Sequence, residues 1–192
     1  MKKIAITPEK DFANEILFIC KILSEGFDYV HIRKPNSSLR EVRNLIESIP
    51  QEFHNKLKLH GHFELINEFN IGGLHLNHRC PAPPQNCSLR LSRSCHSLKE
   101  LSEAPERYEY MFLSPIFDSI SKSGYKSAFK DEEITNGLIE YPGKVIALGG
   151  ITGENISRIK DYGFAGGAFL GYLFNSESIG ILSERIKIIS KI

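Results

Sequence analysis

The sequence predicts one α/β domain, spanning residues 1–192, that closes as a compact (β/α)8 TIM barrel. Two observations lead to this fold class. Short apolar runs typical of buried strands recur eight times along the chain, and nearly every run is followed by a segment with helical periodicity. Strands that alternate with helices pair in parallel through crossover connections. An eightfold alternation most naturally closes into a barrel, although about 250 residues is the more typical length.

The predicted strands are short, apolar and bounded by glycine, proline or polar residues. They cover residues 3–7, 29–33, 57–60, 73–76, 88–92, 110–113, 144–148 and 165–170. An open, doubly wound sheet is the alternative fold. Its usual marker is a GxGxxG turn after the first strand, and that turn is absent from "AITPEKDF". The missing turn favours the barrel.

The segments between the strands carry helical periodicity, with start and stop signals at their ends. The predicted helices cover residues 12–24, 38–49, 63–69, 97–103, a stretch that begins near 152, and 176–190. Gly26 ends the first helix, and Thr152 can cap the helix after the seventh strand. We expect an irregular fourth crossover, because "NHRCPAPPQNC" (77–87) contains three prolines, which disrupt helices.

The composition excludes several functional classes. The chain carries 24 Lys and Arg against 23 Asp and Glu, and it has no basic stripe that would indicate nucleic-acid binding. Its apolar runs are too short to span a membrane, and the first residues lead into a strand instead of a signal-type apolar stretch. The four cysteines show no CxxC spacing and are expected to be reduced thiols. We therefore expect a cytoplasmic protein that binds neither nucleic acid nor membranes.

Chemistry in such a barrel lies at the carboxyl ends of the strands. His31 and Arg33 are two residues apart, so they share one face of the second strand, which we expect to be the barrel interior. An inward arginine keeps its charge and needs an anionic partner. None of the predicted strand ends carries Asp or Glu. The missing acids weaken, but do not remove, the alternative that Arg33 forms a buried pair with a nearby carboxylate, and they favour an anion of the substrate.

Three segments near the strand ends indicate a phosphate site. Gly149 and Gly150 follow the seventh strand, and Gly171 takes the matching place after the eighth. Glycine backbone at a helix start leaves N–H groups free for a phosphate, and barrels frequently bind phosphate there. The third segment, after the sixth strand, contains Ser119, Ser121 and Lys122. Hydroxyls and an ammonium suit an anion with several oxygens, although a solvated serine-rich turn is the alternative for this segment alone.

Six short motifs, in order, resemble those of the thiamine-phosphate synthase and thiazole tautomerase superfamily. They are "HIRKP", "GGLHLN", "SRSCHSLKE", "SPIFDSISK", "ALGGIT" and "GGAFLGYLF". Each motif alone is modest evidence, but six at the right spacing are specific, and the resemblance runs essentially end to end. It implies an enzyme of thiamine biosynthesis that condenses hydroxymethylpyrimidine diphosphate with thiazole phosphate to give thiamine phosphate and diphosphate. It also implies a homodimer.

The resemblance further implies a role for each matching residue. The thiazole phosphate would lie on the Gly150 and Gly171 turns. The leaving diphosphate would lie near Arg33, Ser94 and Lys122, together with Mg²⁺. Negative charge departs with the diphosphate, so cations and hydroxyls directed at it are what the transition state requires.

The sequence departs from the family pattern at several of these positions. His60, Gly61 and Cys80 stand where the synthase pattern has Asn, Asp and a second Asp. The two missing carboxylates are the hard oxygen ligands that would hold Mg²⁺. Pro35 takes the position of the family's strand-two lysine, which leaves the neighbouring Lys34 to contribute to substrate binding.

Two alternatives to the synthase therefore stay open. One is a thiazole tautomerase-like isomerase, although Pro115 stands where that pattern has its catalytic histidine. The other is a non-catalytic protein that binds thiazole or thiamine phosphate. For an enzyme, we expect His60, His31 and Arg33 to be catalytic. His60 would act as acid and base with an unperturbed pKa near 6.5, or it would replace the family asparagine as a simple hydrogen-bonding group.

A transition-metal site is a further alternative. His60 and His62 share a strand face, and His75, His78 and Cys80 follow nearby in the sequence. Nitrogen and sulfur ligands of this kind suit Zn²⁺. An inward histidine is more often hydrogen-bonded than metal-bound, so we predict no protein ligand set for a metal.

Overall fold

The computed structural model describes residues 1–104, 107–118 and 129–191. Within these residues, eight parallel strands close into a barrel in which each strand pairs with the next and β8 pairs with β1. The strands are β1 (Lys2–Ile6), β2 (Tyr29–Ile32), β3 (Leu57–Leu59), β4 (Gly73–Leu76), β5 (Leu91–Cys95), β6 (Tyr108–Leu113), β7 (Val145–Leu148) and β8 (Gly166–Phe169). The predicted (β/α)8 fold class is confirmed.

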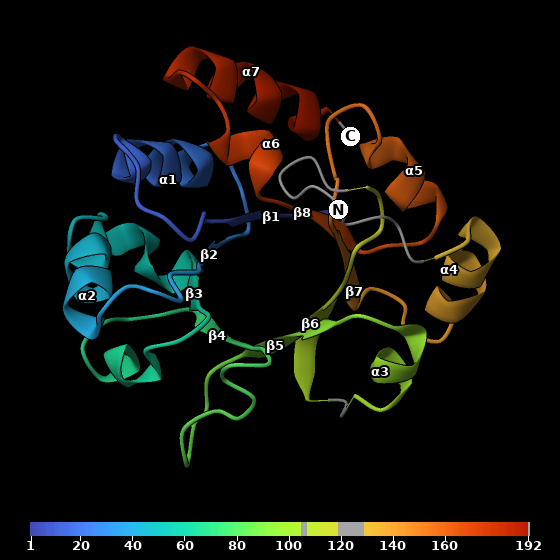
Figure 1. Ribbon diagram of the computed structural model, residues 1–192, viewed down its shortest axis with the longest axis horizontal. Helices are drawn as coiled ribbons and strands as arrows, with labels where there is room; N and C mark the ends of the chain where they lie inside the picture. Colours follow the sequence, from blue (N-terminus) through green and yellow to red (C-terminus); the bar gives the residue numbers. More distant parts are fainter. Residues whose placement is uncertain (105–106, 119–128, 192) are drawn as a thin grey trace.

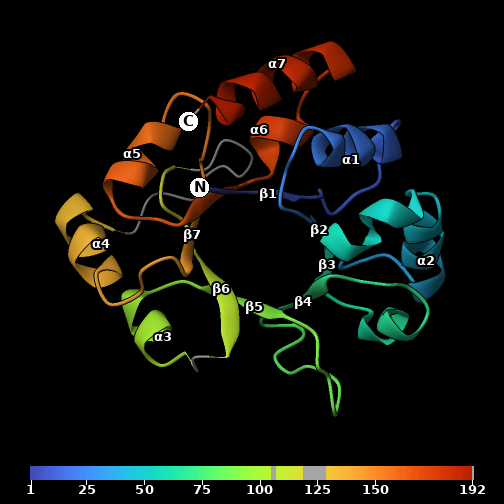
Figure 2. The same ribbon diagram turned by 180° about the vertical axis from the view of Figure 1, so that it is seen from behind.

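Helices surround this barrel (Figures 1 and 2). They are α1 (Glu15–Ser24), α2 (Leu39–Glu47), α3 (Leu98–Ser102), α4 (Asp131–Leu138), α5 (Ile156–Asp161), α6 (Gly171–Phe174) and α7 (Ile179–Ser190), with the 3₁₀ helices η1 (Gln51–Lys56) and η2 (Phe63–Asn67) on either side of β3. Serine side chains accept hydrogen bonds from the first-turn N–H groups of three helices, at Ser38, Ser97 and Ser178. These caps satisfy donors that would otherwise lack intrahelical partners.

Several boundaries differ from the prediction. β5 covers Leu91–Cys95 and not 88–92, because its register against β4 and β6 places Ser92 opposite His75 and Tyr110. The sequence analysis missed α4, whose Asn and Gly residues are weak helix formers. Ile134 and Leu138 hold it by packing into the core. The helix predicted over 176–190 begins later, as α7 at Ile179. The separate short α6, which precedes it, was not predicted.

The crossover from β4 to β5 contains no helix, as predicted, and forms the long loop below β4 and β5 in Figure 1. Asn77 anchors its start, because its side-chain amide donates to the carbonyl oxygen of His60 at 2.8 Å. The same side chain accepts from the backbone N–H of Arg79 at 2.9 Å. The loop therefore leaves the end of β4 in a defined direction and keeps His60 next to it.

The amino-terminal end of the barrel interior is closed by a buried charge pair. The ammonium of Lys58 lies 2.6 Å from a carboxylate oxygen of Glu109, and the hydroxyl of Tyr29 donates to the other oxygen at 2.8 Å. Burial lowers the pKa of Lys58, and the bond to Glu109 opposes that shift. Ile4 and Ile146 belong to the same cluster of buried residues as Tyr29.

Candidate active site

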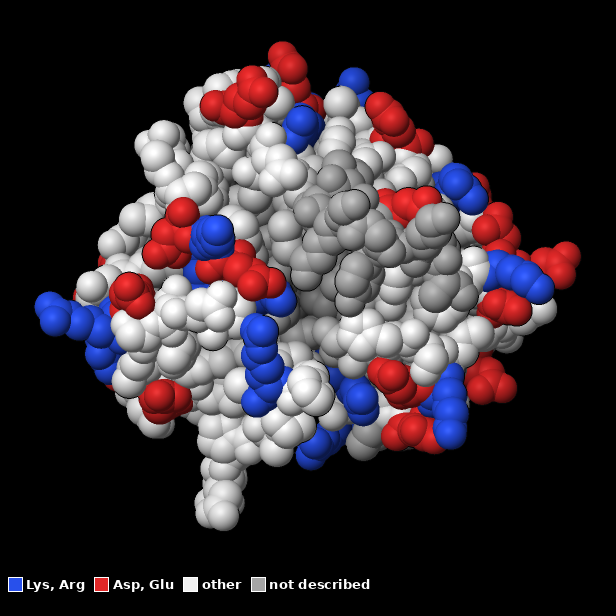
Figure 3. Space-filling model, in the orientation of Figure 1, with Lys and Arg blue, Asp and Glu red and all other residues white. Residues whose placement is uncertain are grey.

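A cavity of about 990 Å³ opens at the carboxyl ends of the strands. Figure 3 views this face and shows Lys and Arg side chains beside a hollow near its centre. Of the residues that the sequence analysis selected, the structure brings these to the cavity wall: Arg33, Lys34, His60, Ser94, Gly149, Gly150 and Gly171. His31 lies beneath them, fully buried. Ser119, Ser121 and Lys122 lie outside the described residues.

The Gly149–Gly150 turn depends on glycine for its conformation. Both residues have positive φ, 95° and 65°, a region that side chains with a Cβ disfavour. A Cβ on Gly150 would also overlap the carbonyl oxygen of Asp118, and one on Gly149 would lie 2.8 Å from Cα of Pro115. The N–H of Gly150 donates to no acceptor in the described part of the chain. The turn therefore presents bare backbone to the cavity, as a phosphate site requires.

Arg33 has a carboxylate partner, which is the alternative that the sequence disfavoured. Its guanidinium donates to Glu9 at 2.7 Å, and its backbone N–H donates to the hydroxyl of Thr7 at 2.9 Å. The loop after β1 supplies this carboxylate, so a substrate anion is not the sole partner of Arg33. The predicted strand ends carry no acid, whereas Glu9 lies in the loop three residues beyond β1. About a quarter of the Arg33 side chain stays exposed at the cavity.

Lys34 also has carboxylate partners. Its ammonium lies 2.8 Å from both Asp11 and Glu15, and its side chain is only 1% exposed. Burial raises the pKa of Glu15, while the hydrogen bond from Lys34 opposes that shift. A role for Lys34 in substrate binding stays a prediction, and it requires the substrate to compete with two carboxylates.

Two histidines and a tyrosine form a hydrogen-bonded group on the cavity floor. His31 Nδ1 lies 2.8 Å from His60 Nε2, and His31 Nε2 lies 2.7 Å from the hydroxyl of Tyr110. His60 lines the cavity, and its Nδ1 has no partner within the described residues. Burial, mainly, lowers the pKa of His60 to about 3, so the expected unperturbed value near 6.5 was wrong. At neutral pH His60 is an uncharged imidazole and a weak base.

A third histidine continues this group on the neighbouring strands. His75 Nδ1 lies 2.9 Å from the hydroxyl of Ser92, and its Nε2 lies 2.9 Å from the hydroxyl of Ser94 at the cavity wall. The hydroxyl of Ser92 in turn donates to the carbonyl oxygen of Leu74 at 3.4 Å. Burial raises the pKa of Tyr110 well above its usual value. Burial also holds the pKa of His75 well below its usual range.

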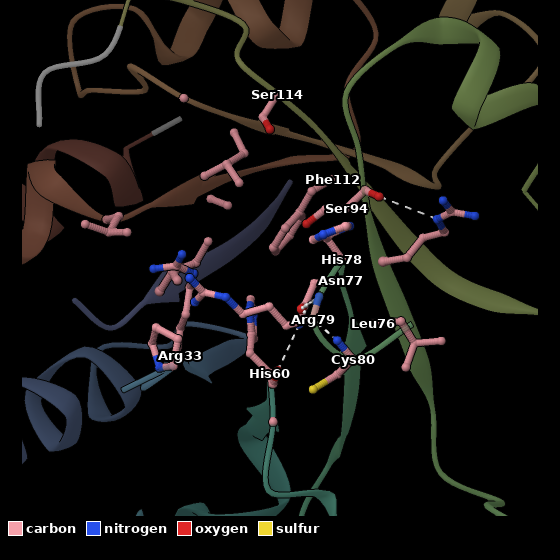
Figure 4. Close-up of a pocket in the computed structure, with 18 of the residues that line it drawn as sticks. Arg33, His60, Leu76, Asn77, His78, Arg79, Cys80, Ser94, Phe112 and Ser114 are labelled. Carbon is pink, nitrogen blue, oxygen red and sulfur yellow. Dashed lines mark hydrogen bonds between the residues drawn. The ribbon is translucent and has the colours of Figure 1, made fainter. Parts of the chain in front are cut away.

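The described lining does not fit Mg²⁺. Among the described residues that line the cavity, Glu100 is the one carboxylate, and it accepts a hydrogen bond from the backbone N–H of His96 at 2.9 Å. Mg²⁺ prefers several oxygen ligands in octahedral geometry. Figure 4 shows His60 and Cys80 in the region where the resemblance implies the magnesium ligands. We derive no step of the reaction through Mg²⁺.

The histidine nitrogens that lie together in the structure are not the nitrogen and sulfur ligands that the sequence suggested for Zn²⁺. One nitrogen each of His31, His60 and His75 lies within 4.8 Å of the others, and in the described residues no such group includes His62 or Cys80. The His60 and His75 rings stack, with centroids 4.1 Å apart and planes 21° from parallel. An imidazole lone pair lies in its ring plane, so stacked rings cannot both point at one metal ion without rotating. Rotation of His75 would break its bonds to both serines.

Most of the chain matches the model of one protein family. A family model described as "Thiamine monophosphate synthase" matches residues 4–172. The chain belongs to this family.

Individual members of the thiamine monophosphate synthase family agree with this assignment. The chain is 34% identical to thiamine phosphate pyrophosphorylase from Bacteroides thetaiotaomicron, with a TM-score of 0.89, over 100% of this chain and 96% of that one. It is 24% identical to the thiamine-phosphate synthase of Syntrophomonas wolfei over 83% of this chain and 80% of the relative. A match to the Limosilactobacillus reuteri enzyme, at 25% identity, covers 65% of this chain but spans only 61% of that protein.

The sequence analysis missed Ser92 and Tyr110 in this family member. A signal for Ser92 was available, because it shares strand parity with Ser94 and therefore the same inward face. Tyr110 looked like an ordinary apolar strand residue. Its place in the site depends on the contact between its hydroxyl and His31, 79 positions away in the chain, which periodicity alone does not reveal.

Proposed function

We propose that this chain is a thiamine-phosphate synthase that condenses hydroxymethylpyrimidine diphosphate with thiazole phosphate. The observation that carries the proposal is the family match over residues 4–172, which includes the elements that form the cavity. The cavity adds a chemical argument. Its wall combines the Gly149–Gly150 turn, whose Gly150 N–H has no acceptor among the described residues, with a serine hydroxyl and arginine side chains, which are groups that bind phosphorylated small molecules.

In this proposal the two phosphorylated groups bind to different residues of the cavity. The thiazole phosphate binds at the Gly149–Gly150 turn and at Gly171. The leaving diphosphate binds near Arg33 and Ser94, with Lys122 and Lys34 as the further cations that we proposed from the sequence. Groups that stabilise charge developing on the diphosphate accelerate the bond cleavage, because that charge is larger in the transition state than in the bound substrate.

A direct assay tests the proposal. The protein is incubated with both substrates, and thiamine phosphate is measured by chromatography. We expect turnover by the unmodified protein and by Ser102→Ala, whose exposed hydroxyl bonds only to the carbonyl of Lys99. We expect Ser94→Ala to lose about tenfold or more, because a hydrogen bond to a charged group contributes roughly 1.5–3 kcal/mol. Absence of thiamine phosphate would contradict the synthase.

An isomerase is the second candidate, and the histidine network favours it. A proton shift on thiazole phosphate needs an acid and a base at one cavity, and His60 and Ser94 are both there. The test offers the unaromatised thiazole phosphate tautomer alone. Turnover of this compound and not of the substrate pair supports the isomerase. Turnover of neither, with calorimetric binding of thiamine phosphate, supports the binding protein.

Location and assembly stay predictions. No helix in the described ranges is both long and apolar enough to cross a membrane. We propose a cytoplasmic protein that acts on small phosphorylated substrates and forms a homodimer. Light scattering on the purified protein distinguishes the dimer from a monomer of 21.7 kDa.

A further inference from the structure

The described wall of the cavity carries more cations than carboxylates. The cations are Arg33, Lys34, Arg79 and Arg93. Glu100 is the one carboxylate in the described part of the wall, and it already accepts the backbone N–H of His96. Carboxylates outside the wall neutralise Arg33 and Lys34. The other two arginines have no carboxylate partner among the described residues, and their charge favours an anion in the cavity.

These two arginines, Arg79 and Arg93, differ in how their side chains are held. The guanidinium of Arg93 lies 5.8 Å from the centre of the Tyr108 ring, which is a cation–π contact. Arg79 is exposed, and it forms no ion pair within the described ranges. In the view of Figure 4 its side chain extends past His60 toward Arg33. Arg79 is therefore the arginine that is available to an incoming ligand.

A short turn fixes the backbone of Arg79 beside the end of β3. The backbone N–H groups of Asn77 and Cys80 donate to each other's carbonyl oxygens, both at 3.1 Å, and close the turn. The side-chain oxygen of Asn77 accepts from the N–H of Arg79 at 2.9 Å, and its amide donates to the carbonyl oxygen of His60 at 2.8 Å. These bonds fix the base of the arginine side chain, so a ligand has to order only the side-chain torsions.

The two positions that the resemblance implies for magnesium ligands lie next to each other, but neither carries an oxygen ligand. A Cβ on Gly61 would lie 3.8 Å from the sulfur of Cys80, which is an ordinary contact distance. Gly61 is not among the glycines with positive φ, so its backbone does not require glycine. Carboxylates at these two positions can therefore reach one ion. The chain instead has Arg79 directly before Cys80.

We propose that Arg79, together with Arg33, holds the diphosphate group in place of a magnesium ion. The inference rests on the proposed function for the identity of this anion. In the condensation, the bond between the pyrimidine methylene carbon and a diphosphate oxygen breaks, and the thiazole nitrogen forms the new bond to that carbon. The electron pair of the broken bond stays on the diphosphate, which gains one negative charge. A guanidinium keeps its own charge, donates to two phosphate oxygens at once and stabilises the added charge.

Binding of inorganic diphosphate tests the inference without any turnover. Titration calorimetry is carried out in EDTA and again with Mg²⁺. We expect the unmodified protein to bind diphosphate in EDTA, and no more tightly with Mg²⁺. Arg79→Met should weaken binding in EDTA by roughly ten- to hundredfold, because it removes a charged hydrogen-bonding group. Arg40→Met removes an exposed arginine of α2 outside the cavity and should leave the affinity unchanged. Equal affinities of these two variants, or binding only with Mg²⁺, would overturn the inference.

A second variant tests the exchange between arginine and metal. Gly61→Asp combined with Cys80→Asp supplies the two missing carboxylates. We expect this variant to bind diphosphate weakly in EDTA, because the carboxylates repel the anion, and more tightly with Mg²⁺. A gain from Mg²⁺ that is as large in the unmodified protein as in this variant would contradict a metal-free site. The calorimetry of the unmodified protein and of Arg79→Met does not depend on the folding of this variant.

The assay for thiamine phosphate separates the inference from the condensation on which it rests. We expect thiamine phosphate to form in EDTA, and to form more slowly in Arg79→Met than in Arg40→Met. Metal-free binding through Arg79 without any thiamine phosphate would refute the condensation and support the diphosphate site. Formation of thiamine phosphate only with Mg²⁺, at equal rates in the two variants, would refute the inference and support the condensation.

Discussion

Lys34 and Glu15 form an ion pair that is almost entirely withdrawn from water, with side chains 1% and 5% exposed. Replacing Lys34 by methionine leaves the Glu15 carboxylate buried without compensation. We expect the free energy of unfolding to fall by about 3–5 kcal/mol, measured by urea denaturation at pH 8. Lys21→Met is the matched control, because its pair with Glu25 lies at the surface, and it should cost at most about 1 kcal/mol.

The same variant has a defined pH dependence. Burial already raises the pKa of Glu15, and loss of Lys34 removes an interaction that lowers it. A carboxyl group whose pKa is higher in the folded than in the unfolded protein contributes stability below the unfolded pKa. That contribution is lost as the pH rises through the pKa of the folded protein. The deficit of Lys34→Met should therefore be smaller near pH 5 than at pH 8. An equal deficit at both pH values would contradict a charged, uncompensated Glu15.

Gly150 combines a conformational and a steric requirement, and the two can be separated by substitution. Gly150→Ala meets strain from φ of 65° and overlap with Asp118, whereas Gly143→Ala meets only the strain, since nothing lies within 4 Å of its Cβ. We expect each to lose roughly 1–2 kcal/mol of stability or more from the strain. Only Gly150→Ala should also weaken inorganic phosphate binding in calorimetry, by about tenfold. Unchanged phosphate affinity in Gly150→Ala would remove this turn from the phosphate site.

At the scale of elements, α2 shows how local sequence signals specify a helix. The hydroxyl of Ser38 accepts from the N–H of Glu41 at 3.3 Å, and the carboxylate of Glu41 accepts from the N–H of Ser38 at 2.7 Å. We expect Ser38→Ala to destabilise the protein by about 1 kcal/mol in thermal or urea unfolding. Ser48→Ala at the other end of α2 serves as the control, and an effect there equal to that of Ser38→Ala would argue against a specific cap.

The helix-free β4–β5 crossover forms part of the cavity wall. Its three prolines prevent a helix, and Asn77 fixes its first turn to the end of β3. The loop therefore brings His78, Arg79 and Cys80 to the cavity wall. A helix in this crossover would carry these side chains away from the strand ends.

At the scale of the whole molecule, the buried histidines couple folding to pH. In the folded protein, the pKa of His60 lies near 3, and burial holds those of His31 and His75 well below the usual range. A depressed folded pKa contributes stability above the unfolded value near 6.5, and that contribution is lost as pH falls below it. Each histidine adds a slope of roughly 1.4 kcal/mol per pH unit below that value.

Urea unfolding between pH 7.5 and 5.5 measures this slope. We expect it to decrease by about a third in His60→Asn, because one of three proton-binding sites of the unfolded chain is removed. His78→Asn, at an exposed position, should leave it unchanged. A slope that does not respond to His60→Asn would show that this histidine does not stay neutral in the folded protein.

The sequence by itself determined the fold class and the place of the site. Strand and helix periodicity report which face of each segment is apolar, and in a parallel barrel every strand ends at the same face. Gly149, Gly150, Arg33 and Ser94 could therefore be assigned to one cavity before any coordinates. The boundaries of a strand such as β5 could not be predicted in this way, because they depend on pairing with β4 and β6 and not on local propensity.

Only the tertiary structure decided which of these side chains form ion pairs within the protein itself. Glu9 neutralises Arg33, and Glu15 with Asp11 neutralises Lys34, although no local pattern links these acids to those bases. The pKa of His60 was also decided by the tertiary structure. Burial among strands that are distant in the chain lowers this pKa, and the sequence does not encode burial directly. Residue types and their spacing specify the strands and the cavity, whereas proton positions and charge partners depend on contacts between residues far apart in the chain.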